Sequence, residues 1–69
     1  MPQLIMASSR SAAELAIRDL CSTGVLARHV VNPSGRSFVV IYCATSDRDH
    51  VLELIKRSDP GSRPVTVWQ

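Results

Sequence analysis

The chain has 69 residues, of which 45% are hydrophobic and 20% are charged, with a formal net charge of +2. This length and composition predict one small globular domain spanning residues 1–69, and they exclude a disordered chain. No apolar run approaches the roughly 20 residues that cross a bilayer, and residues 1–7 lack the basic start of a signal peptide. We therefore expect a cytoplasmic protein without strong nonspecific attraction to nucleic acid, because the positive charge is weak and scattered.

A short strand and a helix are predicted first. Residues 3–7 are extended in character, and Ser11 with Glu14 has the spacing of a capping box, which predicts the start of a helix. Gly24 is a typical C-terminal cap for that helix. Leu15 falls opposite the apolar stripe and is either an exposed contact residue or a lone surface leucine. The stripe itself recurs at helical spacing: Ala13, Ala16, Ile17 and Leu20.

Residues 25–32 and 36–44 are β-branched and extended, and the turn residues Pro33-Ser34-Gly35 between them predict a hairpin. Within the second of these strands, residues 38–43 are apolar on both faces. One face can cover a core, whereas the other needs a second cover. In so short a chain, we expect that cover to come from another molecule.

A second helix and a last strand complete the pattern. Residues 45–47 offer N-cap oxygens, Val51, Leu54 and Ile55 form an apolar stripe, and residues 59–61 stop the helix. Residues 64–68 then alternate as a strand.

This order, βαββαβ, predicts an α+β fold: the ferredoxin-like sandwich, with a four-stranded antiparallel sheet and two helices on one face. The first and third strands are expected at the centre of the sheet. The layer under the helices is expected to contain aliphatic strand residues: Val39, Ile41, Cys43, Val65 and Val67. The open face, and with it the predicted interface, is expected to contain the alternate set: Phe38, Val40, Tyr42 and Trp68.

Across nearly its whole length the chain resembles small ferredoxin-like regulatory modules such as ACT and PII-like domains. The resemblance rests on the element order, on Gly24-Val25 before the second strand, and on residues 51–55 of the second helix. It implies oligomerisation through a sheet face or edge, and recognition of a ligand or a protein.

RNA binding is the alternative, because RRM domains share this topology and stack bases on open-face aromatic residues. Residues 36–42 look partly like the signature strand of those domains, with Phe38 and Tyr42 on one face and Trp68 on the last strand. The aromatic spacing differs, however, and a serine replaces the glycine of that signature. The low charge also favours protein contacts.

Other chemistry has weaker support. Cys21, His29, Cys43 and His50 could supply metal ligands, but no two have the short spacing of structural zinc sites, so neither a metal nor a cofactor is expected. Arg10 resembles the arginine that acylphosphatases carry near their first helix, but their glycine-rich motif is absent and no enzyme is expected. A weak anion site at the first helix remains open, with capping as the simpler explanation of its serines: Ser8, Ser9, Arg10 and Ser11.

We therefore expect a non-enzymatic interaction or regulatory module that forms a homodimer or binds another protein through its open sheet face and edges. A small inhibitor or adaptor, including one encoded by a phage, has the same features. Nucleic acid is the less favoured partner, and no membrane is involved.

Overall fold

The computed structural model describes residues 2–65, and the predicted βαββαβ order is confirmed. The second and third strands are shorter than the sequence pattern predicts, because their ends belong to turns, and the first strand begins one residue earlier than predicted. The elements are β1 (Pro2–Met6), α1 (Arg10–Ser22), β2 (Leu26–Val31), β3 (Ser37–Tyr42), a 3-10 turn η1 (Thr45–Asp47), α2 (Arg48–Ser58) and β4 (Arg63–Val65).

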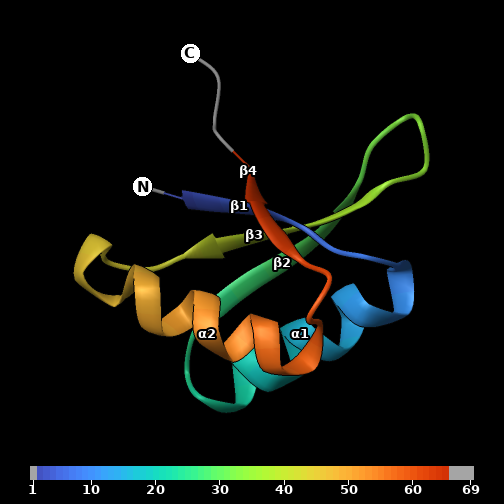
Figure 1. The fold of residues 1–69 in the computed structure, drawn as a ribbon. Helices are drawn as coiled ribbons and strands as arrows, with labels where there is room; N and C mark the ends of the chain where they lie inside the picture. Colours follow the sequence, from blue (N-terminus) through green and yellow to red (C-terminus); the bar gives the residue numbers. More distant parts are fainter. Residues whose placement is uncertain (1, 66–69) are drawn as a thin grey trace.

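The strands form one antiparallel sheet in the order β2-β3-β1-β4, and α1 and α2 lie together against one of its faces (Figure 1). This is the ferredoxin-like sandwich, with β1 and β3 central as predicted. The opposite face carries no layer of its own among the described residues. The register places Val40 between Leu4 on β1 and Arg28 on β2, so these side chains share that open face.

The core confirms which face of β3 is the inner one. Val39 and Ile41 are 0% exposed and pack beneath the helices, with Cys43 partly buried beside them. Alanines on α1 let the helix approach these branched strand residues closely. The remaining core residues come from β1 and the two predicted helix stripes: Ile5, Ala13, Ala16, Leu20, Val51 and Ile55.

The start of α1 differs from the sequence prediction. Ser9, not Ser11, is the N-cap residue, and its Oγ accepts a hydrogen bond from the backbone N–H of Ala12 at 3.1 Å. Glu14 therefore cannot close a capping box with Ser11, which lies inside the helix. It lies instead 3.8 Å from Arg10 Nε, in an exposed i,i+4 ion pair. Ser9 is the cap because its backbone is extended, as an N-cap residue requires, whereas Ser11 is already inside the helix.

Two glycines make the predicted turns possible. Gly24, with φ +86°, ends α1 in a Schellman motif, in which its N–H donates to the Cys21 carbonyl and that of Val25 donates to the Leu20 carbonyl. Gly35, with φ +91°, closes the hairpin between β2 and β3 by donating to the Asn32 carbonyl. Both glycines adopt positive φ angles, which residues with a side chain disfavour.

The entry to α2 also departs from prediction. Asp47 occupies the N-cap position, but its carboxylate makes no capping hydrogen bond, because η1 brings the chain in with helical dihedral angles. Asp49 in the first turn and Lys56 and Arg57 in the last still complement the helix dipole.

The predicted face of Val65 is wrong. Val65 pairs with Leu4, which faces the open side, whereas Pro64 pairs with the buried Ile5. The strand begins one residue before the predicted start. Its pairing with β1 turns Val65 to the face opposite the predicted one. Val65 therefore adds to the open face rather than to the core. Val67 and Trp68, which were assigned to the inner and open faces, lie outside the described residues.

Candidate functional site

The open face of the sheet has an apolar centre. The register sets Phe38 between Met6 on β1 and Val30 on β2, and Val65 opposite Leu4. Between these strands is a hollow of about 330 Å³ in which every lining residue except one is apolar: Leu4, Val30, Asn32, Phe38 and Val65. Phe38 and Val40, both predicted as interface residues, are half-buried by these neighbours.

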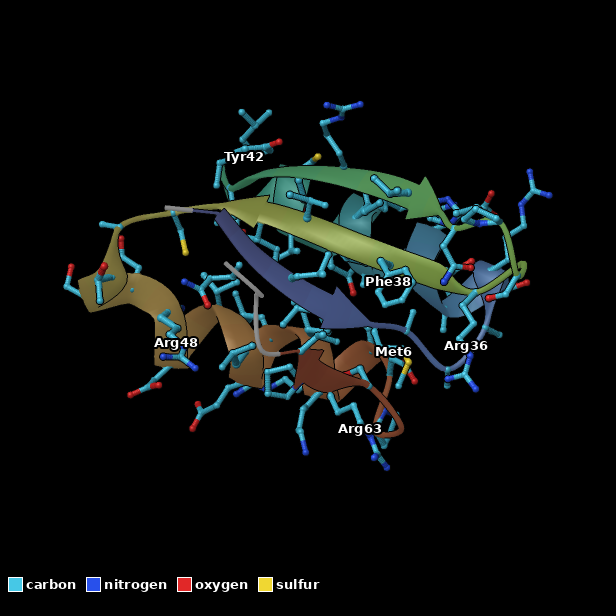
Figure 2. The ribbon with its side chains drawn as sticks, turned by 90° about the horizontal axis from the view of Figure 1, so that it is seen from above. Met6, Arg36, Phe38, Tyr42, Arg48 and Arg63 are labelled. Atoms are coloured by element: carbon cyan, nitrogen blue, oxygen red, sulfur yellow. The ribbon has the colours of Figure 1, made fainter. Side chains whose placement is uncertain are left out.

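Tyr42 is the most exposed of the predicted open-face residues that the structure describes. It lies at the opposite end of β3 from Phe38 (Figure 2) and is 42% exposed. Its cross-strand neighbour Leu26 is 63% exposed, so the pair forms an apolar corner that the chain leaves in water. An amphipathic tyrosine beside an exposed leucine is typical of a contact surface.

The β2 edge continues that surface. β2 is an outer strand of the sheet, so the backbone groups on its far side have no strand partner within residues 2–65. Val30 and Val31 on this strand are exposed like Leu26. Sequence reasoning missed these residues, although an apolar strand predicted at a sheet edge is a usable signal.

The charge of the open face is of one sign. Arg28 is opposite Val40, and Arg63 is opposite Met6, so both arginines belong to this face by register. The other strand residues that share the face by register are apolar or aromatic, and none of the described residues on it is acidic. The apolar centre is therefore flanked by positive charge, which the scattered sequence positions of the arginines conceal.

Leu15 does not join this surface. It is 47% exposed, but it projects from α1, and α1 covers the inner face of the sheet. Trp68, the remaining predicted interface residue, lies outside the described residues. The structure thus brings together Phe38, Val40 and Tyr42 and separates Leu15 from them.

A second hollow lies at the rim of the sandwich, where the connections before α1, before β3 and before β4 meet. This rim cleft has a volume of about 540 Å³. It contains three of the four predicted anion-site residues, Ser8, Ser9 and Arg10, whereas Ser11 is not part of the lining. The preceding residues Met6 and Ala7 also line it, and residues distant in sequence complete it: Gly35, Arg36, Ser37, Gly61 and Arg63.

The serines of the rim cleft have separate structural roles. Ser8 binds the carboxylate of Asp59, a residue that is only 4% exposed, through its backbone N–H at 2.8 Å and its hydroxyl at 2.5 Å. Asp59 also accepts from the N–H of Gly61 at 3.2 Å. Ser9 caps α1 as described above. Capping thus accounts for Ser9, and attachment of the loop to Asp59 accounts for Ser8.

The arginines of the cleft are weakly engaged. Arg10 pairs with Glu14, and Arg36 Nη1 lies 3.1 Å from the sulfur of Met6, a weak acceptor. Figure 2 shows Met6, Arg36 and Arg63 at the same end of the sheet as Phe38. Within residues 2–65, the Arg10–Glu14 contact is the only ion pair.

The cysteines and histidines do not gather. Cys21 is free and exposed, and Cys43, the residue after the end of β3, is free and partly buried. No group of three or more His, Cys, Asp or Glu side chains suited to a metal is formed in the described part of the chain. His29 faces inward from β2, and its buried Nε2 has no hydrogen-bond partner there.

Comparison with protein-family models gives no match, and comparison with curated proteins gives none. No helix among residues 2–65 is both long and apolar enough to span a membrane.

Proposed function

We propose that this chain is a non-enzymatic interaction module and that its working surface is the open sheet face together with the β2 edge. The observation that carries this proposal is the corner formed by Leu26 and Tyr42, two large apolar side chains that are paired across strands and left exposed. Scattered surface leucines are ordinary, but a paired corner continuous with an apolar hollow marks a contact surface. A regulatory role, of the kind that ACT and PII-like domains have, is part of the proposal.

We take a second copy of the chain as the partner. An antiparallel pair of β2 strands is compatible with a two-fold axis, so one copy can satisfy the free backbone groups of the other along the same edge. Such a pairing would bring the exposed side chains of Leu26 and Val30 from both copies beside each other. In that register Arg28 of one copy lies opposite Arg28 of the other, and this pair of like charges opposes association.

Sedimentation velocity of the isolated chain at micromolar concentration tests the proposal. A dimer is the expected species. Tyr42→Ala is expected to shift the equilibrium toward monomer, whereas Leu15→Ala is the matched control, because Leu15 is similarly exposed but lies on α1. A monomer at all concentrations, or equal weakening by both substitutions, would overturn the homodimer proposal.

A small inhibitor or adaptor that binds a different protein is a variant of the same proposal, and a cytoplasmic location fits the exposed free thiol of Cys21. If the chain sediments as a monomer while Tyr42→Ala removes binding to a captured protein, this variant replaces the homodimer.

Single-stranded RNA is the second candidate ligand, and one observation favours it. The open face carries Arg28 and Arg63 around Phe38 and Tyr42 and has no acidic residue in the described part of the chain. Aromatic side chains flanked by arginines are the arrangement that stacks bases and neutralises phosphates.

Arg28→Gln separates the two candidates. For a phosphate ligand, loss of the guanidinium weakens binding and reduces its salt dependence. For a homodimer, loss of a repelling like charge leaves association unchanged or strengthens it. Titration of labelled oligouridylate at physiological salt, beside sedimentation of the same variant, gives both readouts.

A further inference from the structure

We propose that the rim cleft beside the N-terminus of α1 is a binding site for a phosphorylated small molecule. The site adjoins the open face at Met6 and Arg63 but opens at the end of the sandwich, where three connections meet. Its lining includes Arg10, Arg36 and Arg63 and no acidic residue. Three guanidinium groups around one concavity without a carboxylate in its lining are suited to a ligand of multiple negative charge.

Two of these arginines are free to bind it. Within residues 2–65, the guanidinium of Arg36 hydrogen-bonds only the sulfur of Met6, and the Arg10–Glu14 contact is the only ion pair, so neither Arg36 nor Arg63 is held by a carboxylate there. The pair Arg10–Glu14 is exposed and 3.8 Å long, which makes it a weak competitor for an anion. Arg10 lies at the start of α1, Arg36 in the turn before β3 and Arg63 at the start of β4, so the fold, not a sequence run, assembles this charge.

The backbone supplies further donors. The N–H groups at the start of a helix have no partner within the helix, and in α1 those of Ser9, Arg10 and Ser11 bind no other described residue. Ser37 adds an independent donor: it is only 6% exposed, it lines the same cleft, and no described residue pairs with its hydroxyl. A hydroxyl without a described partner, on a largely buried residue beside free amides, can donate to a phosphate oxygen.

The size of the cleft indicates more than a single phosphate. Its volume of about 540 Å³ lies in the range of roughly 300 to 1,000 Å³ that small-molecule sites occupy. Apolar atoms of Met6 and Ala7 line one part of it, beside the arginines. The expected ligand is therefore a diphosphate or a phosphate ester whose anionic end faces α1 and whose remainder lies against Met6.

Titration of the ¹⁵N-labelled chain with sodium pyrophosphate at constant ionic strength tests the site. We expect saturable shifts of the Ser9, Arg10, Ser11 and Ser37 amides, with smaller shifts for inorganic phosphate. The double variant Arg36→Gln/Arg63→Gln should raise the Kd for pyrophosphate about ten-fold or more. The matched control is Arg18→Gln/Arg57→Gln, which removes the same charge from exposed positions on the two helices.

The controls decide between a site and diffuse attraction. Equal weakening by both double variants, or shifts spread over the helices, would show nonspecific attraction and overturn the proposal, as would the absence of saturable binding. Ser37→Ala, which changes no charge, should weaken binding while the amide spectrum outside the cleft stays unchanged. Pyrophosphate titration does not depend on whether the chain is a monomer or a dimer. Loss of the phosphate-site proposal would therefore not affect the homodimer proposal, and a monomer in sedimentation would not affect the phosphate-site proposal.

Discussion

The carboxylate of Asp59 accepts two hydrogen bonds from Ser8, from the backbone N–H at 2.8 Å and from the hydroxyl at 2.5 Å, across a separation of 51 residues. This contact joins the connection before α1 to the connection before β4. A buried carboxylate without donors would be costly, and here the N–H of Gly61 supplies a third. The contact thus fixes two walls of the rim cleft with one side chain.

Asp59→Asn is expected to lower the free energy of unfolding by about 1.5 to 3 kcal/mol, because the amide nitrogen of Asn would face donors where an oxygen accepted them. Urea denaturation measures the change. Asp47→Asn is the matched control, since Asp47 is exposed and its side chain makes no capping hydrogen bond.

A double-mutant cycle with Ser8→Ala isolates the contact. The two substitutions share a hydrogen bond, so their effects should not add, with a coupling energy of about 0.5 to 1.5 kcal/mol. Additive effects would contradict the assigned role of the Ser8–Asp59 pair.

The fold was predictable because its signals are local and mutually consistent. Gly24 after a helical stripe and Pro33-Ser34-Gly35 between two β-branched runs specify the turns, and the order of elements then leaves few topologies. The phase of β4 was not predictable in the same way. Val65 faces the open side because of its register with Leu4, a contact between the two ends of the chain.

The rim cleft was predicted only in part for the same reason. Ser8, Ser9 and Arg10 are neighbours in sequence and precede a helix, so a pattern indicates them. Arg36 precedes β3 and Arg63 begins β4, both distant in sequence from Ser8, and only the packed sheet brings them to the same cleft. The role of Asp59 was hidden because Asp-Pro-Gly after a helix is typical of a turn, whether or not the carboxylate is buried.

Substitutions on the two faces of β3 should have opposite consequences. Ile41→Ala should cost about 2 to 5 kcal/mol of folding stability, enough to unfold a domain of this size, and the milder Ile41→Val about 0.5 to 1.5 kcal/mol. Tyr42→Ala should leave the folded monomer intact, because its ring is exposed. Denaturation is measured at a protein concentration below the dimer Kd, so that dimer formation does not contribute to the difference in stability between the variants. Unfolding caused by Tyr42→Ala would contradict the outward position of that ring.

Gly24 and Gly35 should tolerate asparagine better than alanine. Nothing lies within 4 Å of a Cβ built at either position, so the cost of Ala is that of the positive φ alone, about 1 to 2 kcal/mol. Asn should recover part of that cost, because it enters the left-handed region more readily. Thermal unfolding of Gly24→Ala and Gly24→Asn compares them. Equal stability of the glycine and alanine forms would mean that the Schellman motif is not maintained in solution.

Leu26→Lys should weaken association without harming the fold. Leu26 is 63% exposed on an edge strand, so a lysine there can extend into water, and its charge would be buried or repelled if two β2 edges met. Leu15→Lys places the same charge on a similarly exposed leucine of α1 and serves as the control. In sedimentation velocity we expect at least about a ten-fold rise in the dimer Kd for Leu26→Lys, since burying an unpaired charge is costly, and little change for Leu15→Lys. If Leu15→Lys instead dissociates the dimer, the contact lies on the helical layer, and Leu15 is a contact residue rather than a lone surface leucine.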